Sequence, residues 1–242
     1  MIAFLRFLIT KENIMFRQMI KKSIHKSQHC NRNWDLSKKI PQEDIDLIIE
    51  AATQCPTKQN LNHYKTHVIT DRAVIEKIEA ASSIMEFGSA DNSFLGFDGV
   101  RGYDEGTGPT NSQLSANLVL AFTKDTPHQP SRDGDEAVRQ SSETDGEFGK
   151  EADTYRDDLN QAVGIAAGYV NLASVMLGYS TGCCKCFDRA QVKEALGDSR
   201  EPVLLMGIGV SDPSRQRQEH HTDSSFRFGS HKNMRTFETH YA

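Results

Sequence analysis

The chain has 242 residues, of which 37% are hydrophobic and 25% charged, and its net charge at pH 7 is -5. This size and composition are typical of one large globular domain, and the acidic balance argues against general binding of nucleic acid. Three of the five cysteines lie within four positions and no evenly spread pairs exist, which favours a reducing, cytoplasmic setting over a disulfide framework.

The N-terminal stretch is apolar but short. Residues 1–10 read MIAFLRFLIT, with Arg6 interrupting the run. A membrane span needs about 20 consecutive apolar residues, so we expect no membrane association. We interpret residues 1–14 as an N-terminal extension and residues 15–242 as a single domain.

The rest of the chain alternates between helical and strand patterns. Helices are predicted at 14–24, 43–53, 72–83 and 187–196, and strands at 63–70, 114–123 and 203–210. The stretches 87–110 and 125–148 are polar or rich in glycine and show no clear period, which is typical of irregular, exposed segments. This order predicts an α+β domain in which a small sheet is wrapped by helices.

A long helix with a cysteine-rich loop behind it is the strongest single feature. From Leu159 the sequence carries a stripe of small and apolar residues at helical spacing, and Gly178 is a natural stop. The loop 182–188, GCCKCFD, follows. Zinc usually needs four ligands as two separated pairs, and no second pair exists. A redox pair is available only as Cys183 and Cys186, behind a helix C-terminus rather than at the N-terminus that low-pKa thiols favour.

Two polar stretches are candidates for binding. In the run 28–32, QHCNR, an extended backbone would direct residues 28, 30 and 32 to one side, and Arg32 offers the planar donor fork suited to phosphate. The turn 56–60, PTKQN, follows a helix and concentrates short polar groups. Each stretch is also compatible with an ordinary solvated loop. The sequence contains no glycine-rich phosphate loop of the dinucleotide-binding or P-loop kind.

Together these segments resemble the nitroreductase family of FMN-dependent, NAD(P)H-utilising flavoproteins, from about Met15 to Val210. Arg32 and Trp34 match the family's phosphate-gripping run, whereas Gln28 and Cys30 replace its usual Arg and Ser. The turn 55–64, the Asn-x-Gln segment 111–113 and the Leu-Gly-x-x-Thr-Gly sequence 177–182 match as well.

The resemblance implies a set of cofactor-binding residues and no metal. The family's phosphate-binding run corresponds here to Gln28, His29, Cys30 and Arg32, and its basic tail pair, which also binds the phosphate, corresponds to Arg227 and Lys232. The turn along the ribityl chain corresponds to Pro56, Thr57, Lys58 and Asn60, and the side-chain amides at the flavin edge to Asn111 and Gln113. The backbone amides near flavin N5 and O4 correspond to those of Cys184, Lys185 and Cys186.

The resemblance also implies fold, partners and activity. It implies a nitroreductase-like α+β fold with a small, mostly antiparallel central sheet, in a homodimer that exchanges terminal segments. It also implies that the stretches 87–110 and 125–148 are the variable lids over the open face of the flavin. The activity it implies takes hydride from NAD(P)H and reduces nitro compounds, quinones or a similar small acceptor in ping-pong order. The alternatives are a specialised branch (a dehalogenase, an azoline dehydrogenase or a flavin-fragmenting enzyme) and a non-catalytic flavin-binding protein.

Overall fold

The centre of the molecule is a four-stranded sheet with strand order β1-β2-β6-β5, and every neighbouring pair is antiparallel. The strands are β1 (Tyr64–Ile69), β2 (Leu118–Lys124), β5 (Ser180–Cys184) and β6 (Pro202–Gly209). The computed structural model describes residues 2–61, 63–82, 111–125, 128–130, 136–138 and 149–214. The predicted α+β class with a small antiparallel sheet is therefore confirmed.

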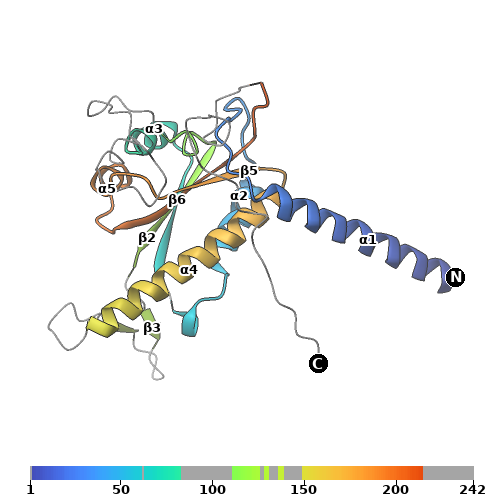
Figure 1. Cartoon of the computed structure of the whole chain (residues 1–242), viewed down its shortest axis with the longest axis horizontal. Coiled ribbons are helices and arrows are strands. Elements are labelled where there is room, and N and C mark those ends of the chain that lie inside the picture. The colour runs from blue at the N-terminus through green and yellow to red at the C-terminus, as the bar shows by residue number, and fades with distance from the viewer. Residues whose placement is uncertain are drawn as a thin grey trace, which may run out of the picture.

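Helices cover both faces of this sheet (Figure 1). Alternate residues of β2 point to opposite faces, as the period of a strand requires. Leu118, Leu120 and Phe122 pack in a core with α2 (Gln42–Thr53) and α4 (Gly149–Met176). Val119 and Ala121 pack in a second core with α3 (Arg72–Ala80) and α5 (Arg189–Leu196). The sheet is thus the middle layer of three, and β2 is buried on both sides.

Short polar residues begin the helices on the second face. The Asp71 side chain accepts hydrogen bonds from Ala73 N and Val74 N at the start of α3, and Asp188 accepts one from Gln191 N at the start of α5. Gly197 ends α5 with a φ of 62°, a left-handed conformation that suits glycine. The predicted bounds of α2, α3, α5, β1 and β6 are confirmed to within a few residues. Two predicted starts are wrong: β2 begins at Leu118 rather than at residue 114, and the first helix begins at Ile2 rather than at residue 14.

The region of the long helix differs from the prediction in two ways. The helix begins at Gly149, ten residues before Leu159. The sequence does not predict these first turns, because they are polar and carry no apolar stripe. The predicted loop 182–188 is also wrong at its start, because Ser180–Cys184 forms β5, which pairs with β6. Gly178 does mark the end of the helical region, with a φ of 100°.

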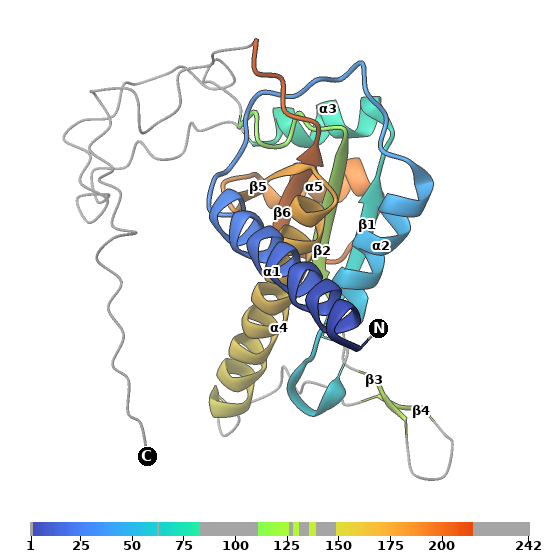
Figure 2. The ribbon, with the colours of Figure 1, turned by 90° about the vertical axis from the view of Figure 1, so that its right-hand side faces the viewer.

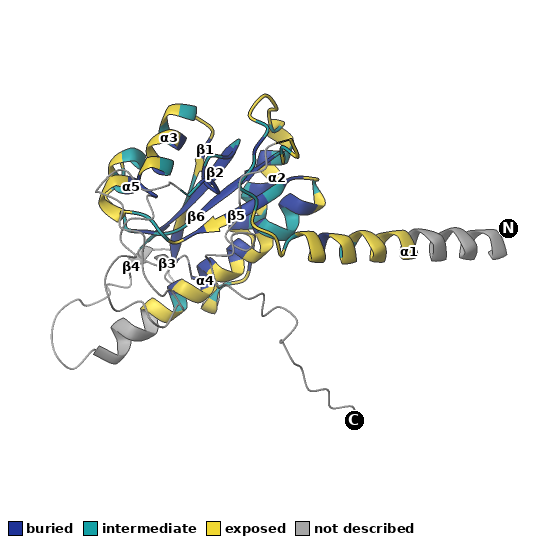
Figure 3. Ribbon diagram, turned by 45° about the horizontal axis from the view of Figure 1, so that its top comes forward, coloured by how far each residue is buried: buried dark blue, intermediate teal, exposed yellow. Residues whose placement is uncertain are grey.

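The N-terminal helix α1 (Ile2–Lys26) projects from the body of the molecule (Figures 1 and 3). It runs without a break across residue 14, where we placed the boundary between extension and domain. Its second half exposes large apolar side chains, namely those of Ile14, Met15, Phe16, Met19 and Ile24. Within the described part of the chain, no helix combines the length and apolar character needed to cross a bilayer.

Three smaller elements complete the described chain. A 3-10 turn, η1 (Lys58–Asn60), lies between α2 and β1, and β3 (His128–Pro130) pairs with β4 (Glu136–Val138). The predicted lid 87–110, most of the predicted lid 125–148, and the tail residues Arg227 and Lys232 lie outside the described residues.

Candidate functional site

The predicted phosphate run lies along the free edge of β5. Cys30 forms a parallel bridge with Thr181, and Asn31 N donates to Thr181 O at 2.7 Å. Trp34 ends the run as an anchor: it is 3% exposed, it bridges to Ser211, and its Nε1 donates to Ser112 O at 2.8 Å. The extended backbone expected for this run is therefore present, held at both ends by backbone pairing.

Arg32 meets the predicted flavin-edge segment at this edge. The Gln113 side-chain amide satisfies both of its neighbours when its nitrogen faces the Cys183 carbonyl, because the reverse orientation sets oxygen against oxygen. In this orientation the amide nitrogen donates to Cys183 O at 2.5 Å, and the amide oxygen accepts from Arg32 Nη2 at 2.9 Å. Gln113 is only 5% exposed, whereas Arg32 is half-buried.

Glycine makes this close approach possible. A Cβ at Gly182 would lie 2.9 Å from Gln113 Cβ and 3.0 Å from Asn31 O. On the next strand, a Cβ at Gly207 would lie 1.9 Å from Gln113 O. Any side chain at either position would push the 111–113 segment off the sheet. We call Arg32, Asn111, Gln113, Gly182 and Cys184 the Arg32 cluster.

Asn111 joins the cluster through sulfur and backbone. Its Nδ2 donates to Cys184 Sγ at 3.0 Å, and its Oδ1 accepts from Gln113 N at 3.1 Å. The structure therefore brings together four predicted site residues from three separate segments. Lys185 and Cys186 follow directly after β5, with Lys185 exposed and Cys186 half-buried.

The surroundings of the thiols beside the cluster favour their protonated form. Burial raises the pKa of Cys184 to about 11. The Cys183 side chain is exposed at the surface, but desolvation by the surrounding protein and nearby Cys30 and Cys184 raise its pKa as well. Burial also raises the pKa of Cys186. Because the thiolate is the reactive form, these shifts argue against a redox pair at 183 and 186. Among the described residues, no group of three His, Cys, Asp or Glu side chains is arranged to hold a metal ion.

The predicted ribityl turn is held by hydrogen bonds and by an ion pair to α4. Thr57 Oγ1 donates to Leu61 O at 2.7 Å, and Lys58 Nζ pairs with Asp158 Oδ2 at 2.8 Å. Asn60 adopts a φ of 55°, a left-handed conformation that asparagine tolerates. Pro56 and Asn60 are exposed, and Thr57 is half-buried.

Two residues that support this turn were not predicted. Asp158 lies 100 positions from Lys58 along the chain, and His63, which is 1% exposed, lies against the turn. Burial lowers the pKa of His63 despite the opposing field of Asp158, so the neutral imidazole is favoured. His63 follows the turn by three residues in the sequence, whereas no sequence pattern links Asp158 to the turn, and only the position of α4 brings it there.

The turn and the Arg32 cluster lie at opposite ends of the sheet (Figure 2). The turn leads into Tyr64, which is paired with Lys124, whereas Gly182 is paired with Gly207 and Gly207 with Val119. The five residue steps from Val119 to Lys124 span roughly 17 Å along the strand. One copy of the chain thus separates the two predicted parts of the site.

The remaining members of the predicted phosphate run are on the surface. Gln28, His29 and Cys30 are exposed, and Gln28 Nε2 lies 3.4 Å from His25 Nδ1. Gln28 therefore has a partner in the last turns of α1, whereas Arg32 is directed toward Gln113.

Comparison with known proteins identifies the fold. A sequence model of the nitroreductase family matches residues 26–210. Two crystal structures align with a TM-score of 0.55. One is a protein from Staphylococcus epidermidis assigned as an NAD(P)H:FMN oxidoreductase, with 19% sequence identity over 90% of this chain and 95% of that chain. The other is a protein from Exiguobacterium sibiricum assigned as a nitroreductase, in complex with FMN, with 17% identity over 90% of this chain and 96% of that chain.

A nitroreductase family protein from Clostridium difficile aligns with a TM-score of 0.52, at 15% identity over 90% of this chain and 97% of that one. A search of curated proteins found no match to the sequence. At these identities the structural matches establish the nitroreductase fold, and the family match covers most of the chain. The chain therefore belongs to the nitroreductase family.

Proposed function

We propose that this protein is a cytoplasmic, FMN-dependent oxidoreductase that takes hydride from NAD(P)H. It passes the electrons to a nitro compound, a quinone or a similar small acceptor in ping-pong order. The observation that carries the proposal is the Arg32 cluster, in which a guanidinium is held half-buried beside a glycine cradle. Membership of the family and the FMN-bound relative from Exiguobacterium sibiricum support the same cofactor.

The donor set of the cluster fits FMN. A phosphate dianion binds best to guanidinium and amide donors, and Arg32 supplies the planar fork. The side chains of Gln28, His29 and Cys30 lie exposed on the same run. Bound flavin supplies the hydride chemistry, while the protein binds and orients it.

Backbone amides are the groups proposed to face the reacting edge of the flavin. Cys184 ends β5, and Lys185 and Cys186 follow it. An amide there donates a hydrogen bond from a fixed position and does not titrate near neutral pH. With the thiols protonated, the loop offers hydrogen-bond donors rather than nucleophiles. The side-chain amide of Asn111 lies beside it, on the Cys184 sulfur.

We propose that the active protein is a homodimer. The turn 56–60 and the Arg32 cluster are separated within one chain, so a site that uses both requires a second copy. Large apolar side chains on α1 and α4 stay exposed in one chain, among them Met15, Phe16 and Tyr169. Burying such a face between copies is typical of obligate dimers. In this proposal terminal segments are exchanged, the tail residues Arg227 and Lys232 reach the phosphate, and the segments 87–110 and 125–148 form lids.

The alternatives differ in chemistry rather than in fold. A specialised branch of the family, or a flavin-binding protein without turnover, is favoured by one observation. Gln28 stands where the family usually has an arginine, and it is engaged with His25 instead. Loss of one phosphate contact would be compatible with a protein that uses its flavin for another reaction or binds it without turnover.

Reconstitution tests the proposal. The purified protein is expected to be yellow or to take up added FMN, with the visible spectrum of a bound flavin. A colourless protein that fails to take up FMN contradicts every flavin-based reading. If FMN binds, anaerobic addition of NADH or NADPH separates a reductase, whose flavin bleaches, from a passive binder, whose flavin does not.

A further inference from the structure

The His63 ring lies against the turn 56–60 and is enclosed by protein. Its side chain is 1% exposed, and neither ring nitrogen reaches solvent. The Lys58 carbonyl accepts from Leu61 N at 3.1 Å within the turn, and the backbone of Lys58 also interacts with the ring. The imidazole is therefore part of the support on which the turn rests.

The charged groups around His63 come from three elements. Asp158 of α4 favours the charged imidazole, whereas the Lys58 ammonium in the turn disfavours it. Both carboxylate oxygens of Asp158 are already paired with Lys58 Nζ, at 2.8 Å and 3.0 Å. At the end of β2, Asp125 N donates to the His63 carbonyl at 3.0 Å, and the Asp125 carboxylate pairs with Arg200. The carboxylates on both sides thus have cationic partners of their own.

A proton on His63 would weaken the support of the turn. Burial is the largest influence on the ring, and it lowers the pKa of His63. An imidazolium gains stability from hydration or from a carboxylate, and at this position it would compete with Lys58 for Asp158. Hydration requires the turn to move away from the ring, and competition breaks the ion pair that fastens the turn to α4. A proton therefore binds better to the open turn than to the closed one.

We propose that His63 is a positioning residue whose neutral ring holds the turn 56–60 in the conformation that binds flavin, so that acid releases the flavin. This inference rests on the proposed function, in which the turn lies along the ribityl chain. Because linkage between two ligands is reciprocal, flavin that binds only the closed turn must also expel the proton. The imidazolium then gives its proton to solvent as the turn closes.

The experiment follows FMN affinity as a function of pH. Dissociation constants are measured by flavin fluorescence on the whole chain between about pH 5 and 8, the range in which a histidine titrates. His63→Gln keeps a neutral polar side chain and removes the titration. His67→Gln is the matched control, because His67 also has a pKa lowered by burial but pairs with Asp198 instead of adjoining the turn. Circular dichroism without flavin checks that each protein is folded at each pH.

We expect the dissociation constant of the unaltered protein to rise below the lowered pKa of His63, approaching about tenfold per pH unit. At neutral pH, His63→Gln should bind FMN within about threefold of the unaltered protein, the worth of less than one net hydrogen bond. In acid, His63→Gln should become the tighter binder. The phosphate of FMN titrates equally in every comparison, so it cancels from the ratio of the two constants. His67→Gln should keep the full loss of affinity in acid.

A second measurement needs no variant. Riboflavin lacks the phosphate, so calorimetry of riboflavin binding in two buffers of different ionisation enthalpy counts the protons that the unaltered protein releases. We expect proton release in the pH range where affinity falls. Binding without proton release there would overturn the inference, as would parallel FMN profiles for His63→Gln and the unaltered protein. Flavin affinity that does not depend on pH overturns only the role of His63, whereas failure to bind either flavin at any pH overturns the proposed function itself.

Discussion

Arg32 is the residue on which the candidate site depends most. It lies half-buried in the cluster, where the buried Gln113 amide accepts from its guanidinium. Replacing it by alanine should reduce the free energy of FMN binding by about 1.5–3 kcal/mol, the usual worth of a hydrogen bond to a charged group. Equilibrium titration of apoprotein with FMN measures this change. Unchanged affinity in Arg32→Ala would show that the phosphate lies elsewhere.

The cysteines beside the cluster should matter through size rather than reactivity. The pKa of Cys186 is raised by burial, and that of the exposed Cys183 is raised by desolvation and the neighbouring thiols, so both shifts favour the protonated form at neutral pH. Cys183→Ser and Cys186→Ser should therefore retain flavin binding and turnover to within a few fold. Steady-state rates with NADH and NADPH check this. Complete loss of activity in either variant, with the fold intact, would restore the redox-pair reading.

At the scale of elements, much of the fold could be predicted because helices and buried strands carry a period. The amphipathic spacing of α2 and the apolar run of β6 identify them from sequence alone. β5 could not be identified this way: its sequence, STGCC, shows no clean alternation. It is a strand because β6 and the Cys30 bridge hold it from both sides, and those partners are distant in sequence.

The candidate site likewise has residues that the local sequence identifies and residues that only the fold brings together. Arg32 was identified from a local run of sequence and its resemblance to a family motif. The burial of Gln113 and the Lys58–Asp158 pair depend on which distant segments the fold brings together. Glycines 182 and 207 show this most clearly. These positions cannot hold a side chain only because the 111–113 segment passes directly over them.

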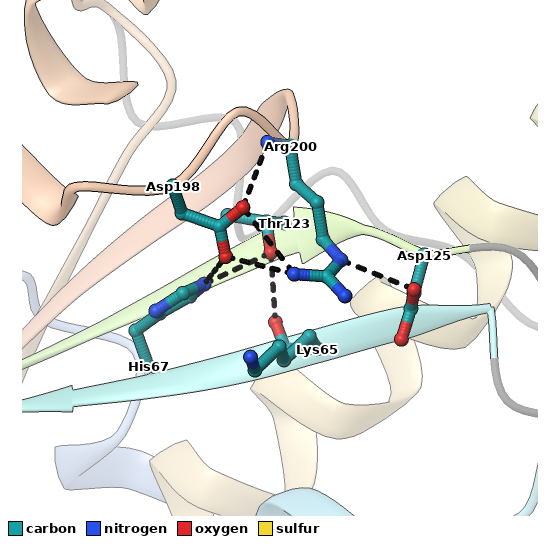
Figure 4. A network of polar contacts seen from close by, with 6 residues as sticks. All are labelled: Lys65, His67, Thr123, Asp125, Asp198 and Arg200. Carbon is teal, nitrogen blue, oxygen red and sulfur yellow. Dashed lines mark hydrogen bonds and ion pairs between the residues drawn. The ribbon is translucent and has the colours of Figure 1, made fainter. Parts of the chain in front are cut away.

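A network of polar side chains lies at the end of the sheet away from the Arg32 cluster (Figure 4). His67 Nε2, on β1, lies 3.1 Å from Thr123 Oγ1 and 3.2 Å from Asp198 Oδ2. Arg200 bridges the two carboxylates: its Nη1 lies 3.0 Å from Asp198 Oδ2 and its Nε lies 3.1 Å from Asp125 Oδ1. The network fastens the segment between α5 and β6 to the strands β1 and β2.

This network should make stability depend on pH. Burial lowers the pKa of His67 from 6.5, with Asp198 opposing that shift and Lys65 and Arg200 adding to it. The fold therefore favours neutral His67, and its contribution is complete above pH 6.5 and is lost as the pH falls through the lowered value. Thermal unfolding across that window should show a smaller loss of stability in His67→Gln than in the unaltered protein.

The exposed His25→Gln variant is the control for this comparison, and it should follow the unaltered protein. Parallel pH profiles for His67→Gln and the unaltered protein would contradict the assignment. They would leave the buried His63, whose pKa is also lowered by burial, as the source of any acid sensitivity.

At the scale of the whole molecule, the proposed dimer would bring together the two parts of the candidate site that one chain keeps apart. The outer face of α4 carries Ile165 and Tyr169, which are 39% and 50% exposed in one chain. Changing both to glutamate should place charge in the proposed subunit interface and shift the protein toward monomer. Sedimentation velocity measures this. Ala190→Glu, at an exposed position of α5 on the other side of the sheet, is the control and should leave the assembly unchanged.

Loss of dimer should carry loss of FMN binding with it, because the turn 56–60 and the Arg32 cluster would no longer meet. A monomeric variant that binds FMN as tightly as the unaltered protein would contradict a site shared between copies. A monomeric unaltered protein would contradict the dimer itself.

The central claim is that the chain uses FMN to move electrons from a nicotinamide to a small acceptor. The most direct test is anaerobic addition of NADH or NADPH to the FMN-loaded protein, followed by a quinone or a nitroaromatic compound, with the visible flavin band recorded throughout. We predict that the band bleaches with at least one nicotinamide and returns when the acceptor is added. A flavin band that neither nicotinamide bleaches would contradict the account.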